Sequence, residues 1–300
     1  MTQESRSGSR RFATVLGWLT PVWVVVSLAA IGWQVTLHWD EIATQPLRLE
    51  LLAMSFVLTI TAKVFSALQV RRSLRQAGID IREGACFYAY SMADLAKYLP
   101  GGIWGFVGRI ALYRALKLDA GTITRALVLE QMWLVGGAVS IGLLLLSFVE
   151  LGTTLRLAAI AAVFAWVAFL FLSRRIATAR SGRFAGLGWL VSVQAALWAL
   201  AGAGFGVLLP SEVIRASGAF CLAFAAGLLA PFAPSGIGVR EAVVAGLVTP
   251  AIPVGDVLRA LVLSRVVWIA ADAAFAVAAF VTCRPAWTEA VLDRKAGEDA

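Results

Sequence analysis

The chain has 300 residues, of which 60 % are hydrophobic and 15 % are charged, and its mean hydropathy is +0.82. A soluble globular domain would carry about 25 % charged residues, so the composition excludes that class and favours an integral membrane protein. The net charge of +8 could suggest nucleic-acid binding. The cations, however, cluster at the ends of apolar segments, which is the pattern of membrane proteins.

Apolar segments of spanning length recur along the chain. Six of them approach the ~20 residues that a helix needs to cross a bilayer: 16–37, 51–70, 126–149, 155–172, 187–209 and 257–283. Two more, 85–107 and 216–248, are interrupted by proline and glycine. We expect six transmembrane spans and two broken helices. The alternative for the broken stretches is a pair of kinked helices that cross the membrane.

The placement of the cations predicts the topology. Eighteen lysines and arginines lie at one set of segment ends, and four (Arg48, Arg156, Arg215 and Arg259) lie at the other. By the positive-inside rule, the first set and both termini are cytoplasmic. Segment 85–107 then has basic residues at both of its ends, which places both ends on the cytoplasmic side, so we expect it to enter and leave the membrane there as a re-entrant hairpin. Segment 216–248 is expected to open to the opposite face. Kinked crossing helices would require cations on both faces.

The two broken segments belong to an apparent internal repeat. The sequence PGGI at 100–103 returns as PSGI at 234–237, and RALVL at 125–129 returns at 259–263. Both matches are separated by 134 residues, a fixed offset that indicates duplication, although RALVL is low-information sequence and chance stays an alternative. We therefore predict an all-α integral membrane fold, with six transmembrane spans and two re-entrant helical hairpins arranged as an inverted-topology repeat.

The expected organisation is a cytoplasmic tail at 1–15, a transmembrane domain at 16–283 with repeat halves at 16–149 and 150–283, and a second cytoplasmic tail at 284–300. The expected location is the cell inner membrane. The protein would cross it several times, with both termini inside.

Charged residues at membrane depth are expensive and are functional candidates by default. They are Lys63, Asp94, Lys97, Glu130, Arg240, Glu241, Arg265 and Asp272. Structural explanations stay open for three of them. Lys63 could snorkel toward Arg71, and Asp94 and Glu130 could be structural partners of Lys97. Asp272 is the expected partner of Arg240, because it lies near mid-depth on the last span.

A helix begins after each proline and glycine break, and its unpaired N–H groups favour anions, phosphate above all. Glycines at the two tips would let a headgroup approach the backbone closely. The predicted substrate-binding residues are Lys97, Pro100, Gly101, Gly102, Glu130, Ser235, Gly236, Arg240, Glu241, Arg265 and Asp272.

No catalytic, metal or cofactor motif is found in the sequence. His38 is the single histidine and is expected at the membrane interface, because no second imidazole could complete a metal site. The three cysteines lack metal-type spacing and are expected to be buried thiols. We therefore expect no cofactor, no metal and no enzymatic activity.

Two motifs resemble those of the lysylphosphatidylglycerol synthase transmembrane region family: KYLPGGIWGFVGR at 97–109 and PSGIGVREA at 234–242. The resemblance covers about residues 16–283 and implies a flippase-like domain that moves a lipid with a charged or glycosylated headgroup between leaflets. Two departures matter. The soluble aminoacyl-transferring domain of the full synthase is missing, so lipid synthesis is not implied. Gly102 stands where a basic residue is common in the family, so the resemblance does not imply that this chain binds the same headgroup.

The leading hypothesis is therefore a lipid translocase for an anionic phospholipid or a polyprenyl-phosphate-linked lipid. Two other classes stay open: an integral-membrane enzyme that acts on lipid phosphates, and a membrane subunit that supports a glycosyltransferase. The expected partners are membrane lipids and no nucleic acid. A homo-oligomer or an association with a lipid-modifying enzyme is also compatible with the sequence.

Overall fold

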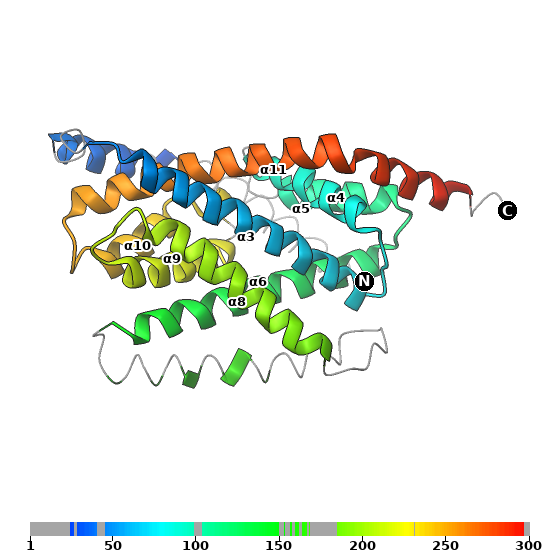
Figure 1. Ribbon diagram of the computed structural model, residues 1–300, viewed down its shortest axis with the longest axis horizontal. Coiled ribbons are helices and arrows are strands. Elements are labelled where there is room, and N and C mark those ends of the chain that lie inside the picture. The colour runs from blue at the N-terminus through cyan, green and yellow to red at the C-terminus, as the bar shows by residue number, and fades with distance from the viewer. Residues whose placement is uncertain are drawn as a thin grey trace, which may run out of the picture.

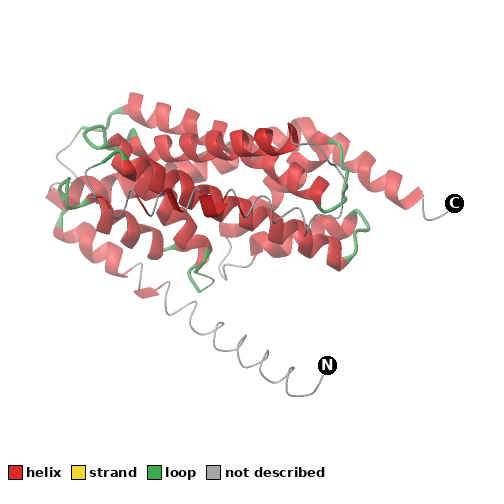
Figure 2. Cartoon of the chain, turned by 90° about the horizontal axis from the view of Figure 1, so that it is seen from below, coloured by secondary structure: helices red, strands yellow, loops and turns green. Residues whose placement is uncertain are grey.

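The protein is an elongated bundle of helices (Figure 1). The computed structural model describes residues 25–26, 29–40, 46–98, 104–149, 185–230 and 232–296, together with isolated positions between 153 and 168. Within these ranges the secondary structure is entirely helical, and most of the connecting loops lie at the two ends of the bundle (Figure 2).

Four long helices form the frame of the bundle: α3 (Leu49–Gln76), α6 (Ala120–Ser147), α8 (Ala185–Gly206) and α11 (Val254–Ala296). Each contains an apolar stretch long enough to cross a membrane. They confirm the helices predicted at 51–70, 126–149, 187–209 and 257–283. Of the span predicted at 16–37, the structure describes residues 25–26 and 29–37, which are helical, and of the span predicted at 155–172 it describes isolated positions only.

Both predicted interruptions fall between short helices, and residues 99–103 of the first one lie outside the described residues. The first set is α4 (Glu83–Leu95), the 3₁₀ turn η1 (Ala96–Tyr98) and α5 (Trp104–Ala115), and the second is α9 (Val213–Leu228), η2 (Pro234–Gly236) and α10 (Val239–Val248). In the second break, Ser235, Gly236 and Gly238 have φ angles of +53°, +70° and +84°. This left-handed backbone cannot continue a right-handed helix, so the chain turns here.

Helices from the two halves of the chain pack on each other. The first helix of each broken set lies along the last long helix of the other half, so α4 packs on α11 and α9 packs on α6. Close approach of α6 and α9 depends on glycine. A Cβ at Gly218 would lie 2.9 Å from the carbonyl oxygen of Gly142, and a Cβ at Gly142 would lie 3.0 Å from that of Gly218. Small residues allow such backbone contact between membrane helices.

Helix α11 is longer than the predicted span. It has 43 residues and continues through Pro285 to Ala296, so the region predicted as a tail at 284–300 is helical over most of its length. At about 1.5 Å per residue, α11 is roughly twice as long as the ~30 Å hydrocarbon core. Its last turns pack on α4, where the rings of Trp287 and Tyr88 stack with centroids 5.6 Å apart. Figure 1 shows this end of α11 projecting beyond the bundle.

Candidate functional site

A cavity of about 280 Å³ lies where the two broken sets meet the long helices. Five cations and three carboxylates line it: Lys63, Lys97, Arg109, Arg240, Arg265, Asp94, Glu130 and Glu241. They come from both halves of the chain, on α3, α4, η1, α5, α6, α10 and α11. Burying this many charges is costly unless they are paired. A cation that already pairs with a carboxylate is neutralised, so the pairing of each charge determines which of them could attract a ligand.

Two lysines and two aspartates form one ion-pair cluster at the wall of the cavity. Lys63 Nζ lies 2.6 Å from Asp94 Oδ2 and also pairs with Asp272. Lys97 Nζ lies 3.1 Å from Asp94 Oδ2 and 2.8 Å from Asp272 Oδ2. The hydroxyl of Tyr98 donates a further hydrogen bond to Asp272. Each aspartate therefore bridges both lysines, and the cluster links α3, α4, η1 and α11 with no net charge.

Two arginines of the cavity also have carboxylate partners. Arg109 on α5 pairs with Glu130 on α6, and both residues are buried. Arg265 Nε on α11 donates to Glu241 Oε1 at 3.0 Å. The same Glu241 accepts a 2.7 Å hydrogen bond from the N–H of Gly238. Glu241 thus caps the start of α10 and fixes Arg265 at once.

Arg240 is different, because its contacts are with an aromatic ring and glycines. Its guanidinium carbon lies 4.0 Å from the centroid of the Phe224 ring, a cation–π contact. Its Nε is buried and has no hydrogen-bond partner. Among the described residues, no ion pair joins Arg240 to a carboxylate. Its positive charge is consequently the one in this cavity that is not matched by a direct anionic partner.

Two glycines make room for the Arg240 side chain. A Cβ at Gly227 on α9 would lie 2.7 Å from Arg240 Nε and 2.9 Å from its Cγ. A Cβ at Gly236 on η2 would lie 2.6 Å from the same Nε. Real Cβ atoms do not tolerate such distances, so Gly227 and Gly236 form a slot that holds the side chain against Phe224.

The two breaks in the chain contact each other directly. The hydroxyl of Ser235 in η2 donates a 2.9 Å hydrogen bond to the backbone carbonyl of Lys97 in η1. Arg265 Nη1 lies 3.5 Å from the carbonyl oxygen of Ser235. The ion-pair cluster on one side and the Arg240 slot on the other are therefore joined through the backbone of the breaks.

The structure brings most of the predicted site residues together. Lys97, Glu130, Ser235, Gly236, Arg240, Glu241 and Arg265 line the cavity, and Asp272 contacts it through Lys63 and Lys97. Pro100, Gly101 and Gly102 lie outside the described residues.

Three expectations about pairing are corrected. Asp272 on α11 pairs with Lys63 and Lys97 and does not pair with Arg240. The reason is that α3 and η1 pack beside Asp272 and place these two lysines within ion-pair distance of it. Lys63 does not snorkel toward Arg71: its side chain is 3 % exposed and faces two aspartates. Glu130 pairs with Arg109, whereas the sequence offered Lys97 as its structural partner.

Lys63 and Asp94, which were predicted only as charged residues at membrane depth, also line the cavity. Three further contributors, Arg109, Gly227 and Phe224, were not singled out in the sequence. Arg109 was counted with the cations at segment ends, yet it is 8 % exposed and lies in the cavity. Arg109 is five residues beyond Trp104, which corresponds to about 8 Å along α5. This short distance from the predicted break could have indicated that Arg109 lies near the site. Gly227 and Phe224 lie on α9 within apolar sequence, and no sequence signal separates them from ordinary helix packing.

Comparisons with known proteins add no family assignment. No protein-family model matches the chain, and no curated protein matches it. The resemblance to the lysylphosphatidylglycerol synthase transmembrane region, based on the two motifs, therefore stays a prediction. What the fold itself defines is an all-α protein with four long apolar helices that are candidate membrane spans.

Proposed function

We propose that the protein is a lipid translocase, which moves a phospholipid or a polyprenyl-phosphate-linked lipid between the leaflets of the membrane. The phosphate would be held in the cavity between the two breaks. The observation that carries this proposal is the state of Arg240. Four of the five cavity cations are neutralised by carboxylates, and Arg240 is left with an aromatic ring and a free Nε. An anionic headgroup would supply the missing partner.

The depth of the cavity supports the proposal. Lys63 is the fifteenth of the 28 residues of α3, so it lies about 20 Å from either end of that helix. A charged cavity at the midpoint of a spanning helix is where transporters place substrate sites. A phosphate there could be reached from both leaflets once the breaks separate.

The same proposal includes the finer fold, in which six spans and two re-entrant hairpins form an inverted-topology repeat. Helices α6 and α11 begin at Ala120 and Val254, which are 134 residues apart, the offset of the sequence repeat. The order of long helix, broken set and long helix occurs twice. Exchange of packing partners between the halves, α4 on α11 and α9 on α6, is expected of two halves related by a pseudo-two-fold axis.

In this mechanism the residues have separate roles. Arg240 would contact the phosphate through charge-assisted hydrogen bonds, while Glu241 would hold Arg265 beside it. The Ser235 hydroxyl and the Lys97 carbonyl would keep the breaks together in the conformation seen here, and their separation would open the cavity to one leaflet. Movement of one half against the other would present the same site alternately to the two faces.

Leaflet exchange in proteoliposomes tests the function. Labelled phospholipids and labelled polyprenyl phosphates would be placed in one leaflet, and their appearance in the other would be timed with and without the protein. We expect faster exchange of at least one of the two phosphate lipids. Equal rates with protein and with empty liposomes, for both classes, would refute translocation and favour the enzyme or the glycosyltransferase-supporting subunit.

A further inference from the structure

A second cavity lies at one end of the bundle, away from the charged site. Its volume is about 390 Å³, and it is bounded by the start of α3 and the segment before it, the loop after α8 and the start of α11. Three long apolar helices begin or end there, so in a membrane this cavity lies at the level of the lipid headgroups. Its residues on α11, among them Arg259 and Leu263, face away from the residues that line the central cavity, such as Arg265 and Trp268.

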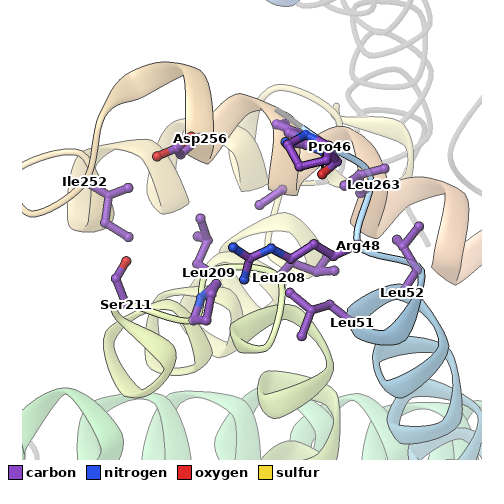
Figure 3. Close-up of a pocket in the computed structure, with 13 residues that line it drawn as sticks. Pro46, Arg48, Leu51, Leu52, Leu208, Leu209, Ser211, Ile252, Asp256 and Leu263 are labelled. Atoms are coloured by element: carbon purple, nitrogen blue, oxygen red, sulfur yellow. Dashed lines mark hydrogen bonds between the residues drawn. The ribbon is translucent and has the colours of Figure 1, made fainter. Parts of the chain in front are cut away.

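The walls of this cavity combine leucines with charged groups. Leu51, Leu52, Leu208, Leu209 and Leu263 supply apolar surface, and Arg48, Arg259 and Asp256 supply charge. Figure 3 shows the Arg48 side chain reaching into the space between the leucines, with Asp256 and Ile252 on the opposite side.

The two arginines have different roles in the wall. Arg259 Nη2 donates a 2.7 Å hydrogen bond to the carbonyl oxygen of Pro46, which ties the start of α11 to the segment before α3. Arg48 is exposed, and no hydrogen bond or ion pair between described residues engages its guanidinium. One arginine therefore shapes the cavity, and the other offers its donors to a ligand.

We propose that this second cavity binds the phosphate of a membrane phospholipid, with Arg48 as the contact and the leucines around the glycerol and the upper acyl chains. Charge and location select this ligand. Arg48 and Arg259 against Asp256 leave one positive charge in excess, which complements a phosphate diester. The leucines would stay wet around a free phosphate ion, whereas lipid chains would cover them. A volume of about 390 Å³ falls within the range of sites that bind small ligands.

This site does not rest on the translocase proposal. A lipid held here would contact α3, the loop after α8 and α11 together, so it would link the two halves of the chain at the membrane surface. It would be retained by a protein that moves no lipid at all.

Native mass spectrometry of the detergent-solubilised protein, titrated with phosphatidylglycerol, tests the proposal. The variants are Arg48→Gln and, as a matched control at the start of α9, Arg215→Gln. Arg215 is paired with Glu212 at 3.1 Å and does not line the cavity. Loss of a charge-assisted contact should weaken binding of one lipid about five- to tenfold in Arg48→Gln, with less than about a twofold change in Arg215→Gln. Leu52→Trp, which fills the cavity, should displace the same lipid.

The variant Arg240→Gln separates the two sites. The effect of Arg48→Gln should be the same in that background, because the cavities are distinct. Unchanged lipid binding in both Arg48→Gln and Leu52→Trp would overturn the proposal. Displacement of the lipid by millimolar inorganic phosphate alone would also overturn it, because the site would then recognise a soluble anion.

Discussion

At the scale of single residues, four cations of the central cavity contact carboxylates and the fifth, Arg240, contacts an aromatic ring. Lys63, Lys97, Arg109 and Arg265 contact carboxylates, and a buried pair of this kind serves mainly to hold helices in register. Arg240 rests on Phe224 in a slot of two glycines. The slot encloses its Nε. Under the proposed function, the terminal nitrogens of the guanidinium would contact the anionic headgroup.

The glycine slot makes a specific prediction. Gly227→Ala would place a methyl group 2.7 Å from Arg240 Nε and 3.1 Å from the Cα of Gly236, so Arg240 must leave its position. Misplacement of a binding group by about 1 Å can reduce a rate by tenfold or more. We expect leaflet exchange to slow roughly tenfold.

The control for this substitution is Gly246→Ala. Gly246 lies on α10 with Arg240, and a Cβ there would meet nothing within 4 Å. The two variants should give similar yields of folded protein, and Gly246→Ala should exchange lipid at the wild-type rate. A wild-type rate in Gly227→Ala would mean that Arg240 does not need the slot.

The ion-pair cluster makes a prediction about stability. Lys63→Met would leave the buried Asp272 and the half-buried Asp94 with one lysine. Removing one partner of a buried pair typically costs about 3–5 kcal/mol. Adding Asp272→Asn removes the excess negative charge, so Lys63→Met/Asp272→Asn should recover part of that loss. The measurement is the melting temperature in detergent. No recovery in the double variant would show that the two residues do not act as one unit.

At the scale of elements, the sequence predicted the helices better than the contacts between them. Hydropathy and helix length identify α3, α6, α8 and α11, because a spanning segment must be both apolar and long. Proline and glycine locate the breaks at η1 and η2. The partner of each charge depends on which helices pack together, which is why Asp272 was assigned to Arg240 and why the position of Arg109 was missed.

The cap at the start of α6 predicts that the stability of this helix end depends on pH. Asp119 precedes α6, and its Oδ1 accepts a 3.0 Å hydrogen bond from the N–H of Thr122. Hydrogen bonds from the side chain and backbone of Thr122 hold the pKa of this exposed carboxyl below its ordinary value. Because the folded-state pKa is lowered, the contribution of the cap is present above the unfolded pKa of about 3.9 and is lost as pH falls through the folded value.

Two substitutions of Asp119 distinguish its role as a helix cap from the effect of its charge. Asp119→Ala should speed hydrogen exchange in the first turn of α6 at neutral pH, because a helix N-terminal donor loses its acceptor. Asp119→Asn should preserve protection, and it should abolish the pH dependence. Equal exchange in Asp119→Ala and wild type would show that the cap does not order this turn.

At the scale of the whole molecule, the proposed topology places the end of α3 and the start of α6 on one face of the membrane. Asp80 and Ala120 are both exposed, and Ser211 is exposed at the far end of α8. Single cysteines at Asp80 and Ala120 should react with an impermeant reagent from the same side, and a cysteine at Ser211 from the other. Labelling of Asp80→Cys and Ala120→Cys from opposite sides would mean that the first broken set crosses the membrane.

The central claim is that Arg240 receives the phosphate of a transported lipid. The most direct measurement is the rate of leaflet exchange by Arg240→Gln in proteoliposomes, beside wild type and Arg215→Gln at equal protein density. Loss of a charge-assisted contact worth about 1.5–3 kcal/mol predicts that Arg240→Gln is about 10- to 100-fold slower, while Arg215→Gln keeps the wild-type rate. Exchange by Arg240→Gln at the wild-type rate, in protein of normal stability, would contradict the account.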